Sequence, residues 1–326
     1  MPVNKRLVTV GLAKQTSGKG VYPTAADYVT GVSGGSVVQT GIKDDDFSST
    51  WATRALEGRD RTGAVPASEY DLYAMPKSIG ELLMAAHGAK ATTGPVSTLY
   101  SHVYTPANSL PYYVVDALEG TEHEMLKDCK LDSLEIDFPN AGAVKLKTKW
   151  IGANISFGAT ALTGGVNERP GIDGVLRSAG GSFQLDGAAV RVKSGNVKIG
   201  NALDPIENAT IITPDDIFEG MVSLAVSLVL IPDDLSTYRK ITTGTTGGTT
   251  IANSPLSGSL DLKWVGPPGA NQPTLELVVP NLVYDPAQIP AADPKGGAME
   301  MTVPAVAAGS ATNAWTATLV NAVSTY

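Results

Sequence analysis

Histidine, cysteine and clustered acids are the side chains with which this chain could perform chemistry, and they are few. The sequence contains three histidines and a single cysteine, Cys129. His123-Glu124 begins the zinc-binding pattern H-E-x-x-H, but Lys127 stands where the second histidine is required. Three consecutive acids from Asp44 could attract calcium, yet the glycine and the final glutamate of a calcium loop are missing. We therefore expect no metal site and no cofactor.

Motifs for nucleophilic catalysis and for phosphate binding are also incomplete. The sequence contains no G-x-S-x-G and no C-x-x-C motif. Gly18-Lys19-Gly20 has the composition of a phosphate-binding loop, but the glycine spacing is wrong and Gly20 replaces the Ser or Thr that would hold magnesium. A single cysteine also excludes an intrachain disulfide. The sequence therefore predicts a protein that is not an enzyme.

The charge balance argues against a protein that grips nucleic acid. Among 326 residues, 24 are Lys or Arg and 32 are Asp or Glu, which gives a net charge of −8. Binding to DNA phosphates requires clustered positive charge. The longest apolar stretch, Met221–Ile231, is about half a membrane span. Because Met1–Ala13 shows no clear cleavage pattern, we expect cytoplasmic synthesis and no membrane insertion.

Strands must position whatever function the chain has, because its clearest periodicity is two residues. Apolar and charged side chains alternate through residues 133–150, on both sides of a loop that contains proline and glycine. Directly opposed residues in a hairpin share a face. A five-residue loop places Ile136 opposite Leu146 and Glu135 opposite Lys147, and a one-residue slip would lose every such match.

The remaining pattern predicts more strands and little helix. One helix is expected from Pro76 to His87, with Gly88 as its stop signal, and a shorter helical turn is expected at Thr213–Asp216. The uncharged tract Ile241–Ile251 reads as a long loop. Further strands are expected at 190–192, 197–199, 222–230, 260–264, 275–279 and 315–319.

Three short matches recur in the same order in the two halves of the chain. They pair 117–120 with 217–220, 133–140 with 227–233, and 149–152 with 263–266. This order favours a duplicated β domain over a coincidence of common strand residues. We expect one domain at 1–165 and a second at 166–326, with Trp150 and Trp264 as equivalent core anchors. The tract at 241–251 would then be an insertion in the hairpin loop of the second copy.

Several segments follow one another in a familiar order: 102–106, 110–112, 118–120, 126–134 with the lysine-rich return strand, 183–192, 200–203 and 222–234. From about Tyr22 to the C-terminus, this order resembles the tail tube (major tail) proteins of long-tailed, non-contractile bacteriophages. The resemblance implies a mainly β fold: two tandem tail-tube-type β-sandwiches with one flanking helix, whose inner sheets join those of neighbours into a β-barrel ring.

The resemblance also implies a function and partners. Rings of this family stack into a hollow tube in the virion tail, and the genome passes through the lumen during ejection. Family rings contain six single-fold chains or three double-fold chains, and the internal repeat favours a trimer with pseudo-sixfold symmetry. The implied partners are further copies of the chain and other tail proteins at the tube ends. The resemblance implies no catalytic residue and no binding site for the transiting DNA.

Two sets of residues are candidates for these roles. We expect an acidic lumen that Glu135 and Asp137 face. There, acids would repel DNA phosphates over a Debye length of about 8–10 Å, although Lys145 and Lys147 would offset them. The polar tract is expected to contact the next ring through Thr242, Gly244, Thr246, Gly248 and Thr250.

The alternative function is a two-domain β-sandwich binding module, such as a surface lectin or adhesin. Such a module would present an exposed aromatic platform or a calcium site. The four tryptophans mostly alternate with polar residues, as core residues do. The tube of a contractile tail is a second alternative, but such tubes are usually built from a shorter chain with a single fold.

Overall fold

The computed structural model describes residues 8–47, 58–119, 122–287, 299–309 and 314–326, and its regular structure is mostly strand. The predicted mainly β class is confirmed. The elements up to residue 168 are β1 (Val8–Lys14), β2 (Tyr28–Gly31), β3 (Gly34–Gln39), β4 (Ile42–Phe47), β5 (Gly58–Ala64), β6 (Ala67–Tyr73), α1 (Ile79–His87), β7 (Gly88–Val96), β8 (Leu99–Pro106), β9 (Tyr113–Glu119), β10 (Glu122–Phe138), β11 (Lys145–Phe157) and β12 (Val166–Glu168).

The remaining elements belong to the second half of the chain. They are β13 (Arg177–Leu185), β14 (Ala188–Ala189), β15 (Val192–Gly200), β16 (Asp204–Ile206), β17 (Asp216–Phe218), β18 (Ser223–Leu230), α2 (Ser236–Thr243), β19 (Ser257–Val265), β20 (Thr274–Tyr284), β21 (Met301–Ala307) and β22 (Thr316–Asn321). Neither helix is long and apolar enough to cross a membrane, so far as the described residues extend.

One antiparallel sheet runs across both halves in the order β3-β6-β11-β10-β15-β18-β21. Its centre is the β10–β11 hairpin, whose predicted register is confirmed: Ile136 lies opposite Leu146 and Glu135 opposite Lys147. The end of β10 also pairs with β15, from Ser133 to Phe138. This second partner joins the halves into one sheet.

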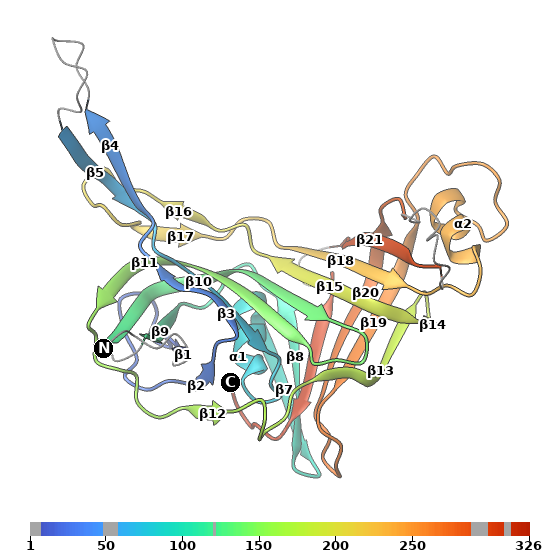
Figure 1. The fold of residues 1–326 in the computed structure, drawn as a ribbon, viewed down its shortest axis with the longest axis horizontal. Coiled ribbons are helices and arrows are strands. Elements are labelled where there is room, and N and C mark those ends of the chain that lie inside the picture. Colours follow the sequence, from blue (N-terminus) through green and yellow to red (C-terminus); the bar gives the residue numbers. More distant parts are fainter. Residues whose placement is uncertain (1–7, 48–57, 120–121, 288–298, 310–313) are drawn as a thin grey trace.

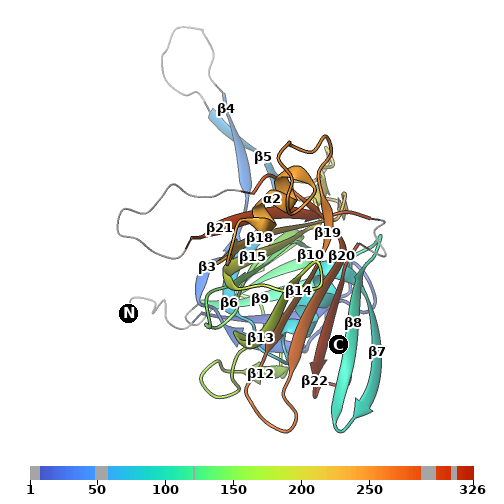
Figure 2. The same ribbon diagram turned by 90° about the vertical axis from the view of Figure 1, so that its right-hand side faces the viewer.

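Further strands pack against this sheet and enclose the core (Figures 1 and 2). In the first half they run in the order β2-β1-β9-β10, and in the second half in the order β13-β19-β20-β22, with β22 pairing onward to β8. Trp150 is fully buried against Tyr113. Trp264 is fully buried against Phe183 and against Phe138 of the first half. The two halves therefore share one apolar core.

The halves have the same order of strand neighbours. The order β1-β9-β10-β11-β6-β3 in the first half matches β13-β19-β20-β21-β18-β15 in the second. In both, a hairpin precedes the strand that leads into a helix. Met75-Pro76 follows the first such strand, β6, and Ile231-Pro232 follows its counterpart, β18.

This topology overturns the predicted alignment of the repeat. The sequence matches paired Pro232 with Pro139 and made the strand of Trp264 the hairpin partner of β18. In the structure, β18 pairs with β15 and β21, while β19 pairs with β13 and β20. The polar tract is therefore no hairpin insertion. Short apolar strands are built from the same few residue types, so the short sequence matches aligned strands that are not equivalent.

The helices agree only in part with the predictions. The first helix is confirmed, and Gly88 ends it at a φ of 82°, which glycine adopts without strain. The predicted turn at Thr213–Asp216 is wrong: Asp216 begins β17, and its carboxylate accepts the N–H of Ile217 at 2.8 Å. The predicted loop at 241–251 is also wrong at its start, because α2 extends to Thr243.

Candidate assembly surfaces

Two hairpin arms leave the same end of the central sheet (Figure 1). The first arm, β4–β5, connects β3 to β6, and the second arm, β16–β17, connects β15 to β18. An ion pair between Lys43 and Glu207 and a hydrogen bond of 2.8 Å from the Ala64 N–H to the Ile212 carbonyl join them. The acidic run that begins at Asp44 lies on β4. The sequence pattern predicted no strand in either arm.

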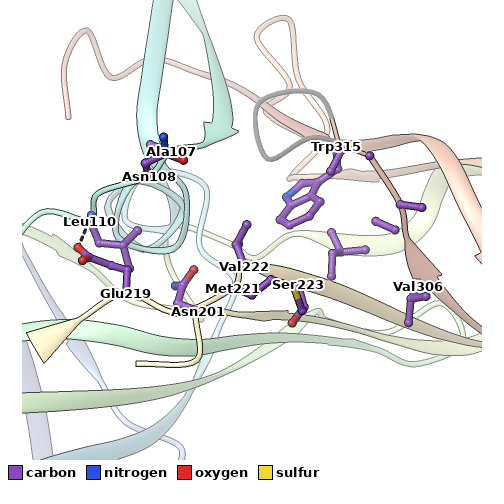
Figure 3. A pocket seen from close by; sticks show the side chains of 16 residues that line it. Ala107, Asn108, Leu110, Asn201, Glu219, Met221, Val222, Ser223, Val306 and Trp315 are labelled. Atoms are coloured by element: carbon purple, nitrogen blue, oxygen red, sulfur yellow. Dashed lines mark hydrogen bonds between the residues drawn. The ribbon is translucent and has the colours of Figure 1, made fainter. Parts of the chain in front are cut away.

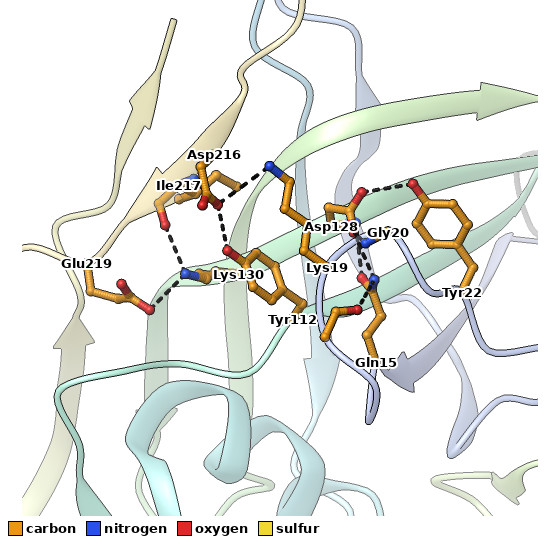
Figure 4. A network of polar contacts seen from close by, with 11 residues as sticks. Gln15, Lys19, Gly20, Tyr22, Tyr112, Asp128, Lys130, Asp216, Ile217 and Glu219 are labelled. Atoms are coloured by element: carbon orange, nitrogen blue, oxygen red, sulfur yellow. Dashed lines mark hydrogen bonds and ion pairs between the residues drawn. The ribbon is translucent and has the colours of Figure 1, made fainter.

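A buried polar network fastens the base of the second arm to the first half (Figure 4). Lys130 on β10 is 4% exposed, and its ammonium group donates to the Ile217 carbonyl at 2.9 Å and to Glu219 at 2.8 Å. The same ammonium lies 4.3 Å from the centre of the Tyr112 ring. The Tyr112 hydroxyl donates to Asp216 at 2.5 Å. These contacts hold the two halves in one relative position at this end.

The network also sets the charge state of its acids. Burial acts to raise the pKa of Glu219, but the N–H of Leu110 and the Lys130 ammonium outweigh it and hold that pKa below its ordinary value. The pKa of Asp216 is likewise lowered: hydrogen bonds from Tyr112 and Ile217 outweigh its burial. Both carboxylates are therefore ionised near neutral pH.

The glycine-rich loop at 15–22 is pinned by a carboxylate and so is not an anion-binding loop. Asp128 accepts the N–H of Gly20 at 2.6 Å, the amide of Gln15 at 2.8 Å and the hydroxyl of Tyr22 at 2.8 Å (Figure 4). A phosphate would have to displace this buried acid, which already occupies the Gly20 N–H group. The phosphate-loop composition at Gly18-Lys19-Gly20 is therefore a structural turn.

The exposed face of the central sheet carries paired charges in its first half. Lys147 lies 3.4 Å from Glu135 and 2.7 Å from Asp137, and Lys198 lies 3.5 Å from Glu135. Lys149 pairs with Asp132 at 3.1 Å. The hydrogen bond to Asp137 raises the pKa of Lys147. The two lumen candidates, Glu135 and Asp137, are thus each paired with lysine.

The same face is uncharged along β18 and β21. The outward positions of β18 and β21 carry small polar or apolar side chains: Ser223, Ala225, Ser227, Val229, Thr302, Pro304 and Val306. One continuous sheet therefore presents a strip of ion pairs beside a neutral strip.

A groove of about 670 Å³ opens where β18 begins and β21 ends (Figure 3). Met221, Val222, Val306 and Trp315 contribute apolar wall, and Asn201 and Glu219 stand at one side. Met221 is 82% exposed and Val306 is 43% exposed. The groove therefore combines depth with solvent-facing apolar side chains.

The polar tract lies at the end of the molecule opposite the two arms (Figure 1). Thr242 is part of α2, and its hydroxyl donates to the Tyr238 carbonyl at 2.9 Å. Gly244 caps the helix at a φ of 80°. The Gly248 N–H donates to Thr245, and Thr246 and Thr250 are exposed. The five candidate residues thus stay close together, on a helix end and the loop after it.

The histidines and the cysteine have structural partners. The indole of Trp315 donates to His87 Nε2 at 3.1 Å, and burial lowers the pKa of His87 to about 4. His123 lies 2.8 Å from Asp116. The Cys129 thiol donates to a backbone carbonyl, and burial raises its pKa. Within the described ranges, no three His, Cys, Asp or Glu side chains are grouped to hold a metal ion.

Comparison with known protein families gives a match that covers nearly the whole chain. The sequence model of the family described as phage tail tube protein matches residues 6–317. A search of curated proteins finds no match.

Proposed function

The chain belongs to the phage tail tube protein family and is a structural subunit of the tail tube; from this we propose that three copies form each ring. Each copy contributes two tandem tail-tube-type β domains, 1–165 and 166–326, so the ring has pseudo-sixfold symmetry. Stacked rings form the hollow tube of a long, non-contractile tail and conduct DNA into the host. The protein is made in the bacterial cytoplasm and has a structural rather than an enzymatic role.

The pairing of β10 with β15 carries this proposal. It joins the sheets of two halves that have the same strand order, so one chain already contains one junction between neighbouring sectors. Closing such a sheet on itself removes the edge strands that would otherwise promote aggregation. Three double sectors close the same ring as six single ones.

Stacking is proposed to join opposite ends of the subunit. The two arms extend from one end, and α2 with the tract at 244–250 occupies the other. Head-to-tail contact between unlike ends is the geometry that produces a filament. Because Thr242 and Thr243 belong to α2, the deletion that tests the tract begins at Gly244. Loss of residues 244–250 should leave the fold intact and impair tube growth, and unchanged tubes would contradict this role.

The exposed face of the central sheet is proposed to line the lumen. Its first half carries the acids Glu135 and Asp137, but both are paired with lysine. The lining is then nearly neutral at contact distance, and the net charge of −8 per chain acts as a weaker background. DNA would slide along such a wall because the described residues of this face form no unpaired lysine cluster that would bind its phosphates.

Electron microscopy and mass measurement test the function. Negative staining of the purified protein should show hollow filaments with a regular axial repeat. Mass measurement of a single layer should give three chains. Six chains per layer would contradict the trimer but leave the tube. A persistent monomer that binds glycans would support the lectin or adhesin alternative and overturn the tube.

A further inference from the structure

The open groove beside Trp315 has a filled counterpart in the first half. There, Ile151 and Ala153 at the end of β11 pack with Leu203 and Ile217 from the base of the second arm. All four side chains are at most 9% exposed. The second arm therefore covers the end of the sheet of the first half.

Strand register shows where the same place lies in the second half. On the buried face, Leu72 of β6 lies opposite Leu146 of β11. On the same face of the other half, Leu228 of β18 lies opposite Val303 of β21. Leu72 precedes Pro76 by four residues as Leu228 precedes Pro232, so these two pairs are equivalent, and counting along each strand from them aligns the halves residue by residue.

Counting from these pairs leads to the groove. Ile151 corresponds to Ala308, and Val65, which packs on the filled cluster, corresponds to Met221. Ala308 and Met221 both line the groove. No described residue of the second half therefore covers the surface that the first half has covered.

The missing cover also exists in the chain, on the first arm. Gln39 lies opposite Ala67 as Gly200 lies opposite Ser223, and these two pairs are equivalent by the same count. Three residues further on, Ile42 takes the place of Leu203. Whereas Leu203 is 9% exposed, Ile42 is 42% exposed at the base of its arm. Its own groove is out of reach, because the first arm joins the second arm at the end occupied by the first half.

The neighbouring strand has an unused edge that continues the same surface. β15 pairs with β18 on one side and with β10 on the other. Its counterpart β3 pairs with β6 alone among the described strands. A copy of this chain that presents β3 to the end of β20 would place Ile42 at the groove.

We propose that the groove formed by Met221, Val306, Ala308 and Trp315 receives the base of the first arm of a second copy, with Ile42 seated as Leu203 is seated within the chain. The inference rests on the proposed function and identifies its ring-forming contact. One chain thus contains one complete junction, between its own halves, and both surfaces of a second junction, which would form between two copies.

The two junctions differ in charge. The internal junction contains the buried Lys130–Glu219 pair. The equivalent positions at the junction between copies are Asn281 and Gly63, by the same count along β20 and β5. No buried ion pair therefore closes the second junction at these positions. An apolar contact without a buried ion pair suits an interface that must form between separately folded chains.

Cysteine cross-linking of the full-length protein tests the contact. Ile42→Cys and Met221→Cys, prepared separately and then mixed under oxidising conditions, should form a disulfide-linked dimer that neither variant forms alone. The double variant should give a ladder that ends at three chains. Buried Cys129 stays in both variants, since it is inaccessible. The matched control pairs Ile42→Cys with Ile172→Cys, which is exposed between β12 and β13, outside both proposed contacts, and should not cross-link.

A second measurement separates this contact from the function itself. Met221→Asp should raise at least tenfold the protein concentration required for tube assembly, while Ile172→Asp, an exposed position outside both proposed contacts, should change it less than twofold. Tubes that form normally with Met221→Asp, or that yield no Ile42–Met221 cross-link, overturn the docking and leave the function standing. Absence of both tubes and cross-links in every preparation contradicts the function and the docking together.

Discussion

The two halves of the molecule share a strand order but differ in how far they bury their helix and the end of their sheet. In the first half, α1 is buried along most of its length, and the end of the sheet is covered by the second arm. In the second half, α2 buries only Ile241, and the corresponding sheet end is an open groove. The first half also carries the ion pairs of the exposed sheet face. Equivalent elements of the two halves therefore differ in burial and in surface charge.

Under the proposed docking, this difference separates a permanent junction within the chain from a junction that forms between two copies. Within the chain, Lys130 and Glu219 are paired in a buried setting, where loss of either partner leaves an uncompensated charge. In the second half, apolar side chains remain exposed at the equivalent place. The following changes test how far the two halves depend on each other.

The largest effect is expected from removing a buried tryptophan. Trp150→Ala and Trp264→Ala should each lower the free energy of unfolding by about 3–5 kcal/mol through the cavity left behind. Because the two halves share one apolar core, we expect each variant to unfold in one step that includes both halves. This holds even for Trp264→Ala, which removes a contact with Phe138 of the first half. Denaturant unfolding followed by circular dichroism and by tryptophan fluorescence measures this. Two separate transitions would show that the halves fold independently.

The buried ion pair should be almost as important. Lys130→Met leaves Glu219 without its cation and should lower the free energy of unfolding by about 3 kcal/mol. The control is Lys263→Met in the second half, whose pair with Glu276 spans 3.9 Å with both side chains about one-third exposed and should be worth less than about 1 kcal/mol. If urea unfolding shows the same loss of unfolding free energy for both variants, the buried ion pair does not hold the two halves together.

The buried helix of the first half should make stability depend on pH. Glu81 is 5% exposed, and burial, followed by the charge of Asp27, raises its pKa to about 7. The folded pKa lies above the unfolded value, so this contribution to stability is complete below about pH 4.5 and is lost as the pH rises through 7. Glu81→Gln should therefore be more stable than wild type above pH 7 by about 2–3 kcal/mol, measured by urea unfolding across pH.

Tyr113→Phe provides the matched control for that change. It keeps the carboxyl group but removes the hydroxyl that donates to Glu81 at 3.0 Å. Because this hydrogen bond lowers the pKa of Glu81, its loss should move the decline in stability to higher pH. Parallel pH profiles for wild type and Glu81→Gln would show that the carboxyl group does not titrate in this range.

The smallest effect is expected on the exposed face of the sheet. Lys147 is about half exposed, and Lys147→Gln leaves Glu135 with Lys198 and Asp137 with Asn196. The free energy of unfolding should change by less than about 1 kcal/mol, and Ser227→Ala on the uncharged strip should match it. A loss above about 2 kcal/mol in urea unfolding would mean that these ion pairs stabilise the sheet rather than serve its surface.

Local patterns in the sequence determined several of the strands, the first helix and the central hairpin. Alternation over 133–150 admits one register, because a slip of one residue turns every apolar side chain to solvent. The helix from Ile79 follows from apolar spacing and from the glycine that ends it. Each of these signals acts between residues near one another in the chain.

Tertiary structure alone decided how the halves meet. Lys130 and Glu219 are 89 residues apart, and nothing in the sequence around either residue predicts that they pair. The pairing of β10 with β15 and the true equivalence of Pro76 with Pro232 depend on which sheet edges come together. The alternation of side chains along a strand shows which of its faces is buried. The edges of a strand pair through backbone N–H and C=O groups, which nearly every residue has, so the sequence does not show which strand lies beside it. Its neighbours are therefore settled only when the whole chain packs.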